Sequence, residues 1–283
     1  MVIFKSLLGL LILANYRWML LGVLYCPFAL AWNATGHRVI AQIAYDHLTS
    51  HAKSRFSAYN RLLNRKNHAY SFVDAAVWLD KVRYMSSLPL EIHYIDLPFT
   101  EEAGSALPKV RSPNAVTALT EAVFSLKNKN TTARARATAL RVLVHVVGDL
   151  HQPLHAATRV SHFYPEGDKG GNLVKLAYNP VADTLHAYWD KGAGVLQPMD
   201  KRQIKHYAAM LEARWPCADE KMYDFNHWAQ LSHQLAIKEA YALHSDDNRL
   251  DSTYQRRAMV ISESQLALAG CRLAHVLNHI DAA

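Results

Sequence analysis

The hydrophobic positions along most of this chain recur at the three- and four-residue steps that are typical of amphipathic helices. The clearest case is the segment 133–150, where Leu140, Leu143 and Val147 share one apolar stripe. Other segments repeat the pattern on a shorter scale. We therefore predict helices over residues 36–48, 114–126, 133–150, 181–192, 201–214, 226–244 and 252–280.

One stretch interrupts this helical pattern. Residues 161–172 are rich in Gly, Pro, Asn and Asp, which indicates a loop, and residues 173–177 could add a short hairpin. We find no internal repeat, low-complexity tract or linker elsewhere in the sequence. The simplest prediction is a mainly α protein with a single compact helical domain.

The composition agrees with this fold class and adds little about function. The chain has 283 residues, of which 51% are hydrophobic and 19% charged, and it holds only 11 Gly and 10 Pro. Its formal charge of +7 favours encounters with polyanions such as nucleic acid or an anionic membrane. A basic, solvated surface explains the same charge equally well.

The first thirty-one residues have the character of a secretory leader. They contain no acidic residue, only Lys5 and Arg17 as basic ones, and they end in a small-x-small pattern at Ala29-Leu30-Ala31. We predict a signal peptide over 1–31 and a mature domain over 32–283, which is secreted or periplasmic without stable membrane association. The alternative is an uncleaved anchor, but neither apolar half reaches the ~20 residues of a spanning helix.

Only two cysteines remain in the predicted mature chain. Cys217 and Cys271 could form one disulfide in an oxidising compartment. With so few thiols and 16 His residues in the sequence, we expect any metal site to use nitrogen and oxygen donors.

Two His/Asp pairs carry the candidate chemistry. His145 precedes Asp149 by four residues, and His186 precedes Asp190 by the same step, which keeps each pair on one helix face. Imidazole and carboxylate are zinc ligands, and His155 adds a third histidine to the first block. Together these residues indicate more than one metal ion. Since a lone histidine is more often structural, we expect structural roles for His47, His151, His227 and His275.

Further features precede and separate these pairs. Cleavage after residue 31 would make Trp32 the N-terminus, so that its amine and carbonyl could chelate a metal beside His37. Asp80 is followed one turn later by Arg83. The extended-looking segment 93–96 reads His-Tyr-Ile-Asp, and Gly170-Gly171-Asn172 precedes the second pair.

In this order the motifs resemble the zinc-dependent type I single-strand-specific nucleases, the secreted family that includes mung bean nuclease. The resemblance runs from Trp32 to Asn278. It implies a mostly helical fold, shared with bacterial zinc phospholipase C, around a cleft with three zinc ions per chain. Carried over, the ligands are Asp80, His93, His145 and Asp149 for one zinc; His155, His186 and Asp190 for a second; and Trp32, His37 and again Asp149 for the third.

The resemblance also implies the reaction. Zinc-activated hydroxide would hydrolyse single-stranded DNA and RNA to 5′-nucleotides, with 3′-nucleotidase activity on 3′-nucleotides. Bridging Asp149 would hold two ions, Asp80 would orient the nucleophile, and Arg83 would compensate charge in the transition state. Tyr94 would stack on a base whose edge Asp96 binds, which requires an unpaired base. We expect a monomer.

Two alternatives remain open. A zinc phospholipase C on the same scaffold is disfavoured by the short Trp32–His37 spacing, by Asp instead of Glu at position 190, and by the 93–96 segment. A zinc-storing or nucleic-acid-binding protein without catalysis would need closed metal sites. The chain departs from the family pattern at Tyr94, at Thr184, at Leu231-Ser232 and in its long 158–172 loop, where we expect changes in substrate detail.

Overall fold

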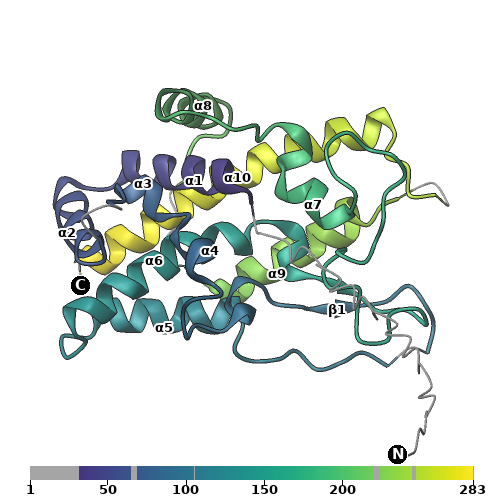
Figure 1. Ribbon diagram of the computed structural model, residues 1–283, viewed down its shortest axis with the longest axis horizontal. Coiled ribbons are helices and arrows are strands. Elements are labelled where there is room, and N and C mark those ends of the chain that lie inside the picture. Colours follow the sequence, from purple (N-terminus) through teal and green to yellow (C-terminus); the bar gives the residue numbers. More distant parts are fainter. Residues whose placement is uncertain (1–31, 65–68, 105, 219–222, 244–246, 283) are drawn as a thin grey trace, which may run out of the picture.

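The computed structural model describes residues 32–64, 69–104, 106–218, 223–243 and 247–282 (Figure 1). The predicted leader, 1–31, lies outside the described residues. The elements are α1 (Ala34–His47), α2 (Ser50–Arg61), α3 (Phe72–Ala75), α4 (Trp78–Val82), η1 (Leu90–His93), β1 (Pro98–Phe99), α5 (Ala115–Lys127), α6 (Ala133–Leu150), η2 (Pro153–Ala156), β2 (Thr158–Arg159), α7 (Leu185–Asp190), η3 (Gly192–Gly194), α8 (Lys201–Arg214), α9 (Phe225–Leu235), η4 (Ala236–Ala240) and α10 (Ser252–Ala282). The chain is mainly α-helical, as predicted.

Capping side chains account for the helix starts that the sequence predicts best. Thr132 accepts a hydrogen bond from the amide of Ala135 at the start of α6. Asp200 and Gln203 form a reciprocal capping box at the start of α8. Such caps satisfy amides that no helical carbonyl reaches, so they fix where a helix begins.

Helix α6 forms the centre of the main core. Its side chains Leu140, Leu143 and Val147 are at most 1% exposed, and α1, α2, α5 and α10 pack around them. Two glycines allow close helix packing. A Cβ on Gly270 of α10 would come within 2.6 Å of the Cβ of Ile43 on α1, and one on Gly148 would come within 3.0 Å of the His37 ring. These contacts hold α1 against both α6 and α10.

A second apolar cluster supports α7, in the part of the molecule farthest from α2 (Figure 1). The Trp189 indole donates a hydrogen bond to the Tyr254 hydroxyl at 2.9 Å, and that hydroxyl donates to the carbonyl of Ala240 at 2.6 Å. These bonds tie α7 to α10 and to η4, which is a π-helical segment. The second His/Asp pair therefore sits on a short but firmly anchored helix.

The only named strands in the described residues form a parallel pair. Pro98 pairs with Thr158 and Phe99 with Arg159. The short hairpin that we expected at 173–177 is reduced to a single antiparallel bridge between Lys175 and Thr184, flanked by backbone hydrogen bonds from Leu176 to Asp183 and from Leu185 to Val174. Thr184 instead caps α7, so this helix begins later than the predicted 181–192.

Helix α2 is absent from our sequence prediction. Its buried residues are only Ala52, Phe56 and Asn60, so its apolar stripe is too thin to be recognised by periodicity. The predicted helix 226–244 is α9 followed by the π segment, and it ends at Ala240.

Cys217 and Cys271 form a disulfide that links the segment after α8 to α10. Among the described residues, no helix combines the length and apolar character needed to cross a membrane.

Candidate metal centre

Asp149 lies at the centre of the first group of predicted ligands. Its carboxylate is fully buried at the end of α6, and imidazoles from three elements face it. His37 Nε2 on α1 is 3.2 Å from Oδ1, while His93 Nδ1 on η1 and His145 Nε2 on α6 are 3.0 and 3.3 Å from Oδ2. Residues more than a hundred positions apart thus meet at one carboxylate.

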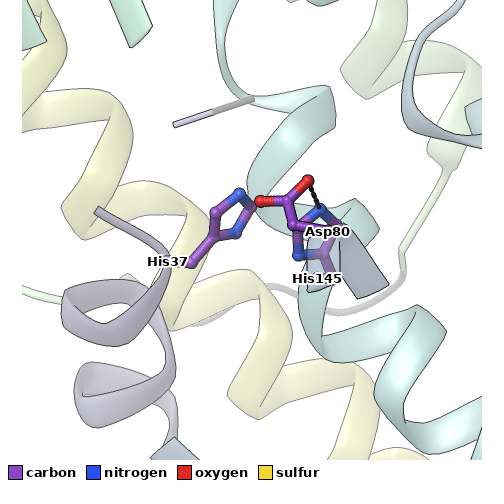
Figure 2. Close-up of side chains that lie close together, drawn as sticks. All are labelled: His37, Asp80 and His145. Carbon is purple, nitrogen blue, oxygen red and sulfur yellow. Dashed lines mark ion pairs between the residues drawn. The ribbon is translucent and has the colours of Figure 1, made fainter. Parts of the chain in front are cut away.

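Asp80 approaches the same centre from α4 (Figure 2). Its Oδ1 is 3.7 Å from His145 Nε2, and the rings of His37 and His145 stack with centroids 3.9 Å apart. Donor atoms of these three residues lie within 4.8 Å of one another, as do those of His93, His145 and Asp149. The two predicted zinc sites that share Asp149 are therefore contiguous in space.

The second group joins η2 and α7. His155 Nε2 and His186 Nε2 are 3.1 Å apart, and they lie 3.7 and 3.4 Å from Oδ1 of Asp190. Gln152 donates a hydrogen bond to the same oxygen at 2.7 Å. Because two imidazole lone pairs repel, nitrogens this close must share a proton or a cation.

Backbone carbonyls orient three of the imidazoles. The Nδ1–H groups of His145, His155 and His186 donate to the carbonyls of Ala76, His93 and Gly170 at 2.6, 2.8 and 2.6 Å. Each Nε2 is thereby directed into the cluster, which is the arrangement that histidine ligands adopt in metal sites.

The donor set fits a divalent cation such as zinc. Within the described part of the chain, four buried atoms at this centre have no hydrogen-bond partner: Asp80 Oδ1, Asp149 Oδ1 and both ring nitrogens of His37. A buried polar atom without a partner costs about 1–3 kcal/mol, and a cation would satisfy several of these atoms at once. Imidazole nitrogen with carboxylate oxygen is a normal zinc environment.

The electrostatics of the donor groups agree with this interpretation. Burial alone would lower the pKa of His145, but Asp149 and Asp80 raise it to about 9. Burial likewise opposes ionisation of Asp149, yet the facing imidazoles, chiefly His145, hold its pKa well below the usual range. Burial raises the pKa of Asp190 to about 7. Metal binding at such groups must displace protons.

Trp32 lies beside the second group. Its side chain is fully buried, and the next amide, that of Asn33, donates to the carbonyl of Asp190 at 2.9 Å. The Asn33 side chain also caps α1 by accepting from the amides of Thr35 and Gly36. The backbone at position 32 is thus fixed close to α7, while its role as a ligand stays a prediction.

The predicted substrate-binding residues follow His93 in an anchored extended segment. The amide of Ile95 donates to the carbonyl of His155 at 2.8 Å, and the carbonyl of Tyr94 accepts from Ala115. Burial raises the pKa of half-buried Tyr94 to about 12 and that of Asp96 to about 6. A carboxyl with this pKa is partly protonated near neutral pH, so it can either donate or accept a hydrogen bond.

The predicted catalytic arginine lies at the end of α4. The guanidinium of Arg83 is 4.7 Å from the ring centroid of the exposed Tyr84, one helical turn after Asp80. The role of Arg83 in compensating negative charge in the transition state stays a prediction.

Our sequence analysis missed the residue that shapes the loop behind His186. Asp168 is fully buried, and its Oδ1 accepts hydrogen bonds from the Arg159 amide, the Gly171 amide and the Tyr241 hydroxyl at 3.0, 3.0 and 2.8 Å. Gly170 lies between Asp168 and Gly171 in the sequence and has a φ of +61°. Its carbonyl orients the His186 ring. The sequence signal that could have identified Asp168 is a carboxylate within a Gly-rich segment.

We predict that Asp168→Ala weakens the second metal group. Loss of three bonds to one oxygen should release the Gly170 carbonyl from His186, and removal of such supporting contacts typically costs 10- to 100-fold in metal affinity. Zinc titration against a competing chelator measures this effect. Glu166→Ala is the matched control, since this exposed carboxylate of the same loop pairs only with exposed Arg111 in the described structure. Equal zinc affinity in the two variants would contradict the role of Asp168.

We predict a pH-dependent gain in stability for Asp190→Asn in chelator. Because burial raises the folded pKa of Asp190 from 3.8 to about 7, its contribution to stability is full below pH ~4 and is lost as pH rises through 7. Asn cannot ionise, so at pH 8 the metal-free variant should unfold with a free energy ~2–4 kcal/mol above that of wild type. Urea unfolding at pH 4 and 8 tests this, with exposed Asp183→Asn as control. A pH-independent difference would argue against it.

The chain is similar to plant and fungal nucleases along most of its length. Endonuclease 2 of Arabidopsis thaliana is 25% identical over 275 residues, covering 88% of this chain and 90% of that protein. Nuclease P1 of Penicillium citrinum is 25% identical over 284 residues, covering 88% and 97%. Nuclease S1 of Aspergillus oryzae is 24% identical over 164 residues, covering 56% and 53%. The S1/P1 nuclease family matches residues 32–282, so the chain belongs to this family and is a hydrolase of the nuclease type.

Proposed function

We propose that this chain is a secreted or periplasmic, monomeric, zinc-dependent enzyme that hydrolyses single-stranded DNA and RNA to 5′-nucleotides, with 3′-nucleotidase activity on 3′-nucleotides. The observation that carries the proposal is the buried Asp149 carboxylate, which three imidazoles face. A second His/Asp group, with His186 and Asp190, accompanies it. Membership of the nuclease family supports it.

Three zinc ions would be held by the residues that the sequence predicts. Bound zinc supplies positive charge to a phosphodiester and lowers the pKa of coordinated water towards ~7. The proposed ligands are Asp80, His93, His145 and Asp149 for one ion; His155, His186 and Asp190 for another; and the backbone of Trp32 with His37 and Asp149 for the third. The third set requires removal of residues 1–31, so we include cleavage after Ala31 in the proposal.

The protein's own groups would position the reactants. Asp80 keeps 12% of its side chain exposed, so it can accept a hydrogen bond from an attacking water while facing His145. Arg83 would offset negative charge on the phosphate in the transition state. Tyr94 would stack on an unpaired base and Asp96 would hydrogen-bond to its edge, which favours single strands without reading sequence.

We predict that chelation of metal or Asp149→Asn abolishes hydrolysis of denatured DNA. The substitution removes negative charge at the point where two cations would share a ligand, so the activity should fall by at least ~100-fold, as is common for a lost electrostatic contribution to catalysis. The measurement is release of acid-soluble nucleotides, with duplex DNA as the comparison substrate. Glu166→Ala serves as the control variant, because its carboxylate is exposed and forms its ion pair with exposed Arg111, not with a residue of the cluster.

The same protein should be assayed on phosphatidylcholine vesicles. Cleavage of lipid without cleavage of polynucleotide would favour the phospholipase alternative. Full nuclease activity in Asp149→Asn would instead favour a contaminating enzyme and a non-catalytic, metal-binding protein.

We predict that the aromatic face of residue 94, not its hydroxyl, contributes to binding. Tyr94→Ala should raise KM for single-stranded oligonucleotides by ~5- to 100-fold, since one stacked base is worth ~1–3 kcal/mol. Tyr94→Phe should stay close to wild type. Steady-state kinetics on a short oligonucleotide measures both variants, and an equal loss in each would show that stacking is not the role of Tyr94.

A further inference from the structure

A second set of potential metal donors lies at the other end of α1, apart from the candidate metal centre. His47 Nε2 is 2.6 Å from Oε1 of Glu212 and 3.6 Å from Sγ of Cys217, and these donor atoms lie within 4.8 Å of one another. Cys217 is joined by its disulfide to Cys271, which brings a second sulfur to the cluster. Our sequence analysis expected a structural His47, because no other candidate ligand lies near it in the sequence, and metal sites without thiolates, because only two cysteines remain in the predicted mature chain.

Three helices hold this cluster, so its geometry does not depend on the disulfide alone. His47 is in the last turn of α1, where its carbonyl accepts from Asn278 Nδ2 of α10 at 2.9 Å. The Asn278 side chain also accepts from the amide of Thr49 at 3.0 Å. Glu212 projects from α8, which packs against both α1 and α10. His47, Glu212 and Cys271 are therefore positioned by packed helices, while Cys217 lies in the segment just after α8.

The donor spacing suits a tetrahedral zinc ion. With Zn–N near 2.0 Å and Zn–S near 2.3 Å, tetrahedral nitrogen and sulfur donors lie about 3.5 Å apart, close to the 3.6 Å that separates His47 from Cys217. The Glu212 carboxylate would need to move by less than ~1 Å to reach a comparable spacing. The side chains of His47 and Glu212 are 44% and 20% exposed, so a cation can enter from solvent.

We propose that this cluster is a zinc site that forms when the disulfide is reduced. A dithiol reductant transfers two electrons and two protons to the Cys217–Cys271 bond, which breaks to give two thiols while the reductant becomes a disulfide. Each thiol then loses its proton as zinc binds. The resulting site has two thiolates, one imidazole and one carboxylate, which are all zinc ligands and together fill the four positions of a closed tetrahedral site. Zinc thereby replaces the disulfide as the link between α10 and the segment after α8.

This proposal is independent of the proposed nuclease function, and metal content tests it. The protein is prepared oxidised and reduced with dithiothreitol, loaded with zinc, desalted under nitrogen and weighed by native mass spectrometry. We expect one more zinc per chain in the reduced form. Reduced protein loaded with Co²⁺ should also show thiolate-to-metal charge-transfer absorption that the oxidised form lacks.

Matched histidine variants locate the extra ion. His47→Ala should lose the additional zinc in the reduced form and leave the count of the oxidised form unchanged. His51→Ala should keep the additional zinc, because this nearby exposed histidine pairs with Asp281 instead. Glu212→Gln should weaken retention of the ion during desalting.

Three results would overturn the proposal. The first is an equal zinc count in reduced and oxidised protein. The second is a reduced His47→Ala protein that keeps the extra ion, which would show that the cysteines bind zinc without this histidine. The third is a reduced chain that unfolds as readily in zinc as in chelator, since zinc would then provide no link between the two segments.

Discussion

The structure depends on one buried negative charge. Asp149 is fully buried near the end of α6, the helix at the centre of the main core, and burial of a carboxylate is unfavourable unless cationic or hydrogen-bonding groups surround it. His93 and His145 face one oxygen of this carboxylate and His37 faces the other, and two close helix contacts bring these three elements together. Gly148 admits the His37 ring, and Gly270 admits α1 against α10. The same helix contacts that pack the core therefore also bring the candidate donors together.

Local signals in the sequence were sufficient to predict most of the helices. They were insufficient where long-range contacts determine the secondary structure. Helix α6 and α8 have the predicted bounds because an apolar stripe coincides with a capping residue at each start. Helix α2 buries too few side chains to show a stripe. The expected hairpin at 173–177 is only one antiparallel bridge, and the strands that do pair, β1 and β2, lie some 60 residues apart in sequence, beyond the reach of a local pattern.

The candidate donors could be selected from the sequence because zinc ligands come from a few residue types, and in the structure the His and Asp side chains of each group lie close together. The contacts that orient these donors could not be predicted from the sequence. The carbonyls of Ala76 and Gly170 that orient imidazoles belong to the backbone, which every residue has, so sequence cannot single them out. Asp168 acts through hydrogen bonds to residues that only folding brings near it, Tyr241 among them. His47 likewise acquires its neighbours from tertiary packing alone.

The short parallel pair of β1 and β2 has a consequence for how this architecture can diversify. Each strand closely follows a histidine of the cluster, His93 in one case and His155 in the other, and Ile95 adds a further backbone bond between the same two segments. This brace joins the two histidine-bearing segments ahead of the turns that follow it, at residues 106–112 and 160–167. Changes in chain length in these turns are therefore expected to leave the candidate metal donors in place.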